Sequence, residues 1–578
     1  IMRTSRFIFL SLVLVYIIIS VMGCSGNEKD KGFVLKIRVA EEPDCLNPIV
    51  SQSSVATQIE GFIMPPLFEF NPDHLELSPL MVQRMSPAVM LNDTTVQYEY
   101  QILDHAVFSD GHPVSGIDVA FTVKAALNPH VKNGTWRGSF KNIQNVEIDP
   151  KNSKTFKISI AKNYMLSQEL SGNFNIYPAH DYDPNHIMDQ YNIPELVHND
   201  STGYSTEKWN ALKSFAETFQ SAAFCRERIT GAGAYELKSW QNGTKIILEK
   251  KKNWWGNEYI KDYPMLAAYP DQIEFWIMPD EAASVISLKD GTIDLMAKVN
   301  AKQFEELKKT NADQLDFITP TTMQYYYLEL NTRNPGLNEK NVRKALASII
   351  DVDLFIQSNF NGLAQRIIGP VHQTKTYYNT KLKPIAYDLE YATKLLAEAG
   401  WKDTDKDGIL DKNVAGKKIK LQFKMLVAGK EIGKNLGIVL QENAKKIGIQ
   451  IDLESKESAL LLDAVKNQQF DIATMLSSQP NTLWDPFQSW HSSNTNVGGS
   501  NRCGFATVQT DSLITQIRNA HTSKEREDAY LWFQEILYDE QPQIFLFSTM
   551  ERIAFNKRIS CKPTSLKPGY VATLITKR

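Results

Sequence analysis

The residues best spaced to bind a metal ion form an aspartate-rich turn. Its four carboxylates are Asp403, Asp405, Asp407 and Asp411. Together with Gly408 they match the opening of a calcium-binding loop, in which carboxylate oxygens surround the ion. Such loops end with a bidentate glutamate, but that position is Val414 here, so we favour a carboxylate-rich turn between a helix and a strand. Calcium at this turn stays the alternative, and no other cofactor is expected.

A second group of ligand-type side chains is compact in the sequence. It consists of His180, Asp181, Asp183 and His186. These residues could hold a metal ion in a surface hydrolase, but we favour a proline-rich surface loop. The chain contains no G-x-S-x-G, H-E-x-x-H or Walker pattern, and no G-x-G-x-x-G after a strand. We therefore expect a protein that is not an enzyme, and the surface hydrolase stays the alternative of another class.

Composition limits the class of protein. The 578 residues suggest about three or four structural units, and 43% hydrophobic with 22% charged residues is ordinary for a folded chain. Lysine and arginine number 63 against 66 aspartate and glutamate residues, so a dedicated nucleic-acid binder, which usually has a basic excess, is not expected. The cysteines of the body are Cys45, Cys225, Cys503 and Cys561. Their wide spacing argues against a zinc cluster, and their pairing is open.

The N-terminal segment is expected to direct export. Two arginines precede an apolar stretch over 7–22 that is too short for a comfortable membrane span. The stretch leads into Gly23-Cys24, which resembles a bacterial lipobox. This resemblance implies a lipoprotein signal peptide over 1–23, lipidation of Cys24, and a polar tether over 24–32. An uncleaved anchor or an ordinary signal peptide is the alternative. We expect an exported protein, periplasmic or at the cell surface, that a lipid anchors to a membrane.

Local patterns in the body predict strands and helices without repeats. Alternating apolar and polar residues predict a strand over 33–40. Two further strands, 235–240 and 245–249, are joined through Asn242-Gly243, which is a strong hairpin signal. Amphipathic spacing predicts helices over 341–350, 389–399 and 436–447. We therefore expect an α/β protein with more than one sheet.

Several ordered motifs resemble one family. The first motifs are 108–119 (FSDGHPVSGIDV), 231–235 (GAGAY) and 253–256 (NWWG). The later ones are 288–294 (LKDGTID), 342–346 (VRKAL) and 395–401 (LLAEAGW). In this order they resemble the extracytoplasmic solute-binding proteins of family 5, the peptide/nickel-type receptors of ABC importers. The resemblance covers nearly the whole body of the chain.

The resemblance implies a periplasmic-binding-protein type II-like fold. That fold is α/β, with two lobes around a cleft and an extra domain inserted in the first lobe. The expected limits are 33–66, 225–317 and 545–578 for the first lobe, 67–224 for the extra domain, and 318–544 for the second lobe. The chain is expected to cross between the lobes at 318–323 and at 542–547.

The resemblance also implies a function. The cleft would capture an oligopeptide-like ligand and deliver it unchanged to the permease of an ABC importer, whose ATPase subunit supplies the energy. A nickel or metal chelate, or an oligosaccharide, is the alternative ligand, since the fold alone does not select the ligand. We expect a monomer.

Candidate ligand contacts come mostly from one segment. In peptide-binding relatives an aspartate three positions before an acidic-proline pair captures the amino terminus of the ligand. The pair here is Asp485-Pro486, and the earlier position is Thr482, so Asp485 or Glu42 would have to substitute. Aromatic walls could come from Tyr325, Trp484 and Trp490. For the two tryptophans, packing in the core is an equal alternative.

Overall fold

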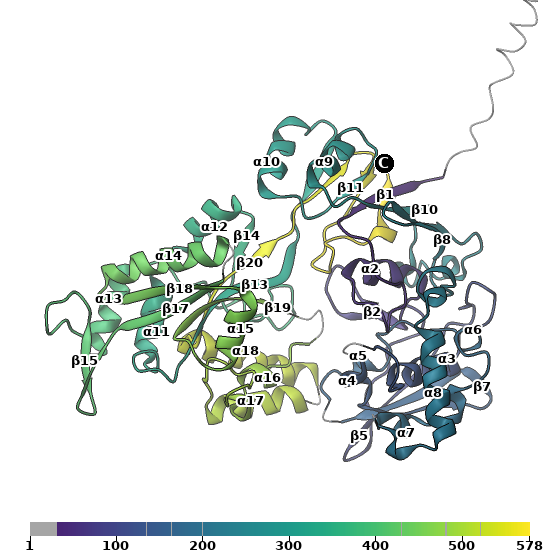
Figure 1. Cartoon of the computed structure of the whole chain (residues 1–578), viewed down its shortest axis with the longest axis horizontal. Helices are drawn as coiled ribbons and strands as arrows, with labels where there is room; N and C mark the ends of the chain where they lie inside the picture. Colours follow the sequence, from purple (N-terminus) through teal and green to yellow (C-terminus); the bar gives the residue numbers. More distant parts are fainter. Residues whose placement is uncertain are drawn as a thin grey trace, which may run out of the picture.

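The structure, a computed structural model, describes residues 32–133, 136–162, 164–198, 200–428, 431–479, 483–520 and 522–578. The predicted signal peptide, the lipidation of Cys24 and most of the predicted tether lie outside these residues and stay predictions. Within the described ranges, no helix combines the length and the apolar character that crossing a membrane requires. The described chain forms two bodies that lie side by side in Figure 1.

A seven-stranded mixed sheet forms the first lobe. In spatial order its strands are β12 (Leu315–Ile318), β21 (Ile553–Asn556), β11 (Leu295–Met296), β1 (Val34–Val39), β10 (Gln272–Ile277), β9 (Lys245–Lys250) and β8 (Tyr235–Gln241). β1 runs parallel to β10 and β11, and β8 pairs antiparallel with β9. The predicted hairpin is confirmed, and Gly243 takes a left-handed φ of 66° in its turn.

A four-stranded antiparallel sheet lies between β1 and β8 along the chain. Its strands, in spatial order, are β4 (Val89–Asn92), β5 (Thr95–Gln101), β7 (Asn152–Ala161) and β6 (Ile143–Asp149). Helix α3 (Gly116–Leu127) packs on β6 and β7, and the Ser115 hydroxyl at its N-terminus accepts a hydrogen bond from the Ile117 amide. One continuous core contains Tyr100 of this inserted domain and Phe275 of the first lobe. The two therefore form one body, at the right of Figure 1.

The second lobe contains a six-stranded sheet, at the left of Figure 1. Its strands, in spatial order, are β14 (Ala364–Arg366), β20 (Gln543–Met550), β13 (Thr321–Leu330), β19 (Ile472–Ser478), β17 (Gln422–Ala428) and β18 (Gln450–Lys456). Successive side chains of β17 enter different cores, because side chains alternate between the faces of a strand. Helices α11 (Lys340–Ser348), α13 (Leu389–Glu398) and α14 (Glu431–Lys446) enclose one core. Helices α15 (Ser458–Lys466), α17 (Val508–Asn519) and α18 (Ser523–Glu540) enclose the other.

Two short connections join the bodies. The first follows β12 and enters β13, so it falls within the expected crossing at 318–323. The second runs from β20 to β21 and lies a few residues after the expected range 542–547. The reason is that β20 stays paired with β13 and β14 almost to its end, so residues 545–550 belong to the second-lobe sheet. The other domain limits stay predictions.

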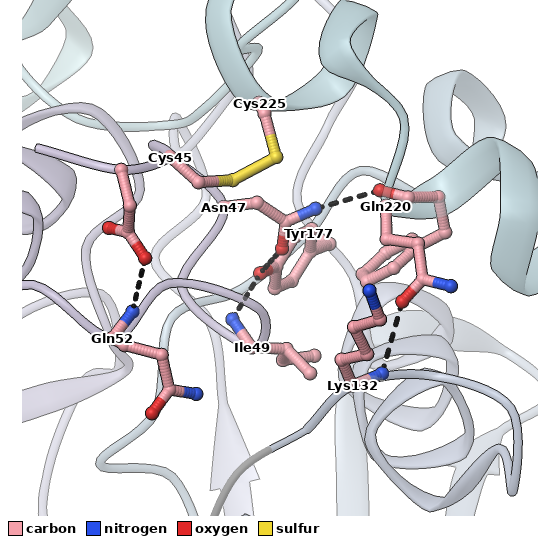
Figure 2. Close-up of a disulfide and its surroundings, with 10 residues drawn as sticks. Cys45, Asn47, Ile49, Gln52, Lys132, Tyr177, Gln220 and Cys225 are labelled. Atoms are coloured by element: carbon pink, nitrogen blue, oxygen red, sulfur yellow. Dashed lines mark hydrogen bonds between the residues drawn. A yellow bond between two sulfur atoms is a disulfide. The ribbon is translucent and has the colours of Figure 1, made fainter.

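A disulfide between Cys45 and Cys225 closes the junction of the first lobe and the inserted domain (Figure 2). Its Cα atoms lie 4.6 Å apart. Beside it, the Asn47 side-chain amide donates to the Phe219 carbonyl at 2.9 Å and accepts from the Tyr177 hydroxyl at 2.6 Å. Among the described residues, Cys503 and Cys561 are free and buried. The pairing that the sequence left open is therefore Cys45 with Cys225. This disulfide links the chain before the inserted domain to the chain after it.

Candidate functional site

A cavity of about 970 Å³ lies where the first lobe, the inserted domain and the connections meet. Helix α2 (Ser54–Ile63) forms one wall, and the Ser53 hydroxyl begins it by accepting hydrogen bonds from two amides. The helix is amphipathic: Ile59 and Ile63 face the core, whereas Gln58 and Phe62 face the cavity. The loop over 564–574 forms another wall. The cavity therefore combines apolar surface with a few polar groups, as ligand sites commonly do.

Helix α2 is held in place by a close backbone contact between its C-terminal end and the segment 231–233. A Cβ atom added to Gly233, which lines the cavity, would lie 2.2 Å from the Phe62 carbonyl oxygen. A Cβ atom on Gly231 would lie 1.9 Å from the Ile63 carbonyl oxygen. Only glycine fits at these two positions, because any side chain would displace the end of the helix. The GAGAY motif thus serves packing at the edge of the cavity.

Two carboxylates of the inserted domain line the cavity. Glu69 Oε1 accepts hydrogen bonds from the Phe70 amide at 2.8 Å and from the Asn173 side chain at 3.2 Å. Burial raises the pKa of Glu69. Burial raises the pKa of Glu169 to about 7, with a further increase from Glu69 and an opposing effect of Lys375. The Glu169 Oε2 atom is buried and has no hydrogen-bond partner among the described residues.

A second charged group lines the cavity near the connection between the lobes and is mainly basic. Its members are Lys298, Lys567 and Glu551. Burial raises the pKa of Glu551, and Lys298, Arg552 and Lys567 oppose that increase. Lys298 takes a left-handed backbone conformation with φ of 57°, which is uncommon for residues other than glycine and asparagine. The cavity is therefore lined both by acidic residues of the inserted domain and by a mainly basic group near the connections.

The second lobe contains buried polar side chains that the sequence analysis did not identify, and they are not among the described residues that line the cavity. The His372 amide donates to Gln479 Oε1 at 2.8 Å. The Nε2 atoms of both side chains are buried without a hydrogen-bond partner among the described residues. Burial lowers the pKa of His372 to about 4 and that of Lys375 to about 8. These residues come from loops with no periodic pattern, so no sequence signal marked them.

Comparison with known proteins decides the family. The model of the bacterial extracellular solute-binding proteins, family 5 (middle region), matches residues 89–500, which is more than half of the chain. The chain belongs to family 5 of the bacterial extracellular solute-binding proteins. The predicted family is thereby confirmed.

Relatives and solved structures agree with this family-5 assignment. The oligopeptide-binding protein AppA of Bacillus subtilis is 24% identical over 539 residues, which cover 93% of this chain and 90% of AppA. The nickel-binding periplasmic protein of Escherichia coli is 23% identical over 244 residues, covering 42% and 44% of the two chains.

Among solved structures, the unliganded open form of the murein tripeptide binding protein MppA superposes with a TM-score of 0.74 at 17% identity, covering 95% of this chain and 98% of that one. AppA in complex with a nonapeptide gives 0.60 at 22% identity, covering 94% and 99%. The predicted two-lobed α/β fold is confirmed by these likenesses.

In this family-5 chain, Glu42 holds a hairpin. Its carboxylate accepts hydrogen bonds from the Trp240 indole at 2.7 Å and from the Gly243 amide at 3.0 Å. Arg226 lies 3.6 Å from the same carboxylate. These bonds tie the loop after β1 to the β8–β9 turn, and Glu42 is not among the described residues that line the cavity. Ligand contact by Glu42 stays a prediction without support from this geometry.

The predicted aromatic walls lie in the second-lobe core. Trp484 stacks on Tyr530 with ring centroids 6.3 Å apart, and Trp490 meets Phe533 edge-on at 6.2 Å. Tyr325 is buried in the same core. The structure therefore favours the packing alternative for both tryptophans, because their apolar area is already covered by the protein.

The polar candidates of the same segment are Asp485 and Thr482. Asp485 Oδ2 lies 3.4 Å from Arg518 Nε, and its Oδ1 accepts from the Phe487 amide at 3.0 Å. Asp485 is therefore already engaged within the second lobe. Thr482 lies outside the described residues. Capture of a ligand by either residue stays a prediction.

The His180 group does not form one site. Asp181 pairs with Arg228 at 2.6 Å, and Asp183 accepts from the Ile187 and Met188 amides. His186 pairs with Asp189 instead. His180 Nε2 lies 2.6 Å from Asp110 Oδ2 of the FSDG turn, and His112 Nδ1 lies 3.2 Å from the same oxygen. The chain neighbours therefore diverge, because they lie on a short helix and the turn that follows it.

The aspartate-rich turn brings some of its carboxylates together. Ligand oxygens of Asp403, Asp405 and Asp411 lie within 4.8 Å of one another. Lys418 Nζ lies 2.8 Å from Asp405 and 3.0 Å from Asp411, and Lys420 pairs with Asp405 and Asp407. These ammonium groups hold the pKa of Asp405 well below its usual range. The lysines supply the positive charge that calcium would bring, which favours the carboxylate-rich turn, and calcium stays the untested alternative.

Proposed function

We propose that this family-5 protein is the substrate-binding lipoprotein of an ABC importer and that it captures an oligopeptide in the cavity where the first lobe, the inserted domain and the connections meet. One observation carries the proposal: a cavity of about 970 Å³ that is lined by carboxylates of the inserted domain and by lysines near the connections. That volume is far larger than a bare metal ion needs and lies at the upper end of the usual range for small-ligand sites. The name of the oligopeptide-binding relative AppA supports the same ligand class.

The two connections support a hinged capture mechanism. Each body has its own large sheet, and within the described ranges the chain passes between these two sheets at the β12–β13 and β20–β21 connections. A ligand that contacts both bodies favours the arrangement in which they close on it. The higher TM-score to the unliganded open MppA than to the nonapeptide complex of AppA supports an open arrangement here. Closure would then present the loaded protein to a permease, whose ATPase partner supplies the energy.

An extracytoplasmic location is that of the family, and the Cys45–Cys225 disulfide supports it for this chain, because such bonds persist in oxidising compartments. Lipidation of Cys24 and the membrane anchor are part of the proposal. Metabolic labelling with a palmitate analogue tests the anchor, since a Cys24→Ala variant would lose the label. Labelling that survives this substitution would contradict the assignment of Cys24.

Native mass spectrometry of the protein as isolated tests the ligand class. A series of bound peptide masses, unchanged after incubation, is the expected result and agrees with a binding protein without turnover. A bound sugar or a metal chelate would replace the oligopeptide by one of the alternatives. Shortening of added peptides by the pure protein would overturn the binding function in favour of a surface hydrolase.

A further inference from the structure

An incompletely paired carboxylate lines the cavity. Glu69 lies on β2 (Phe68–Phe70) and Glu169 on α5 (Ser167–Leu170), and both line the cavity with Asn173. Asn173 donates to Glu69 and not to Glu169. The buried Oε2 atom of Glu169 has no hydrogen-bond partner among the described residues. A buried carboxylate oxygen without a partner is costly, so this position favours an incoming donor.

Among the described residues, the charged groups that act on Glu169 are Glu69 and Lys375. Glu69 and Glu169 contribute two carboxylates, and the cation that acts on Glu169 is Lys375 of the second lobe. The side chain of Met165, just before α5, packs against the second-lobe core, so this face of the inserted domain lies against the second lobe. When all three groups are ionised, their sum is one negative charge. One further cation would balance it.

We propose that Glu169, supported by Glu69, receives a cationic group of the ligand, such as the amino terminus of a peptide. This inference rests on the proposed function and names the recognition at that site. The position at which the family resemblance implies amino-terminus capture is Thr482, which carries no charge. A carboxylate on the inserted domain thus supplies the anion that the second lobe lacks at that position.

Cation binding at Glu169 is coupled to proton release. The pKa of Glu169 is about 7, raised by burial and by Glu69 and lowered by Lys375, so a fraction of this carboxyl is protonated near neutral pH. A cation beside the carboxylate lowers its pKa and displaces that proton. Binding of a peptide amino terminus therefore strengthens from pH 6 to about pH 7 as Glu169 ionises, and weakens again above about pH 8, where the amino terminus itself loses its charge. The binding enthalpy depends on the ionisation enthalpy of the buffer.

The experiment compares two peptide mixtures by isothermal titration calorimetry. The probe is a randomised mixture of short peptides without lysine, arginine or histidine, so that the amino terminus is the only cation. The second mixture is the same preparation after acetylation of its amino termini. The proteins are the parent chain and the Glu169→Gln, Lys375→Met and Glu41→Gln variants. Glu41 lines the same cavity but its side chain is exposed, so its substitution is the matched control.

The parent is expected to bind the free peptides roughly 10- to 100-fold more tightly than the acetylated ones, the range of a charge-assisted hydrogen bond. Glu169→Gln loses this preference and the proton release, whereas Glu41→Gln and Lys375→Met keep the preference. Equal binding of both mixtures by the parent overturns the inference and leaves the proposed function standing. Equal weakening of both mixtures by Glu169→Gln and Lys375→Met overturns it too, because Glu169 would then only pair with Lys375. Failure of the parent to bind either mixture overturns the proposed function itself.

Discussion

Removal of the Cys45–Cys225 disulfide should destabilise the first lobe and the inserted domain. The substitution is the double variant Cys45→Ala/Cys225→Ala. The bond closes a loop with a sequence separation of 180 residues, and the chain-entropy model gives about 5 kcal/mol for a loop of this size at 25 °C. Engineered and native cases commonly give about 2–4 kcal/mol, because the unlinked chain keeps some structure. We expect a loss within these limits.

Some native contacts at the junction survive the substitution. The Leu46 amide donates to the Cys225 carbonyl at 2.8 Å, and Asn47 keeps its bonds to Phe219 and Tyr177. These bonds preserve the folded geometry, so the loss should come from the unfolded state. The free energy of unfolding is measured by urea titration followed by circular dichroism, without ligand.

Controls separate the disulfide from the loss of two sulfur atoms. Reducing agent should lower the stability of the parent to that of the double variant and should leave the double variant unchanged. Cys561→Ala, at a buried free thiol, should cost clearly less. If the double variant unfolds within about 1 kcal/mol of the parent, the bond adds nothing beyond the neighbouring hydrogen bonds, and the loop-closure reasoning is refuted.

Three further substitutions or additions test other parts of the structure. Burial raises the pKa of Glu60 to about 8. The folded state therefore holds a proton that the unfolded state loses above about pH 4.5. The free energy of unfolding should consequently fall as the pH rises from about 5 to 8. Glu60→Gln should flatten this profile and stabilise the protein at pH 8 by roughly 1–4 kcal/mol in urea unfolding, and an unchanged profile would refute the assignment. Gly233→Ala should lower the free energy of unfolding by roughly 1–3 kcal/mol and weaken ligand binding, because its Cβ meets the Phe62 carbonyl. Gly138→Ala is the control, since its Cβ would enter open space, and it should cost little stability. Equal effects of the two substitutions would contradict the close-approach argument. Calcium titration should give no heat and no thermal shift, since Lys418 and Lys420 already neutralise the aspartate-rich turn, and a clear shift would restore the calcium site.

Local chemistry made part of the fold predictable. The Asn242-Gly243 turn and the helix that ends before Gly400 both appear where expected, because each depends on residues close in sequence. The end of β20 was not predictable to the residue. Its sequence, QIFLFSTM, is apolar for most of its length, and nothing local marks where the chain leaves one sheet for the other.

The candidate site was harder to predict for a physical reason. Glu69, Glu169 and Lys375 come from distant segments, and only the tertiary arrangement brings them together. A glutamate between two phenylalanines on β2 was the one available hint, since charges are uncommon in apolar strands. Trp484 and Trp490 show a different difficulty, because the sequence left ligand wall and core packing as equal alternatives for them. Aromatic residues suit a ligand wall and a core equally well, and burial by helix α18 decides for the core.

The shared core of the inserted domain and the first lobe has a geometrical consequence. Glu169 and Lys298 both line the cavity and belong to the same body, which the Cys45–Cys225 bond also ties together. The distance between them therefore stays constant while the other body moves. A zwitterionic ligand whose two charges are separated by that distance would contact both residues before the protein closes. The first body would thus select ligands by length, independently of their side chains.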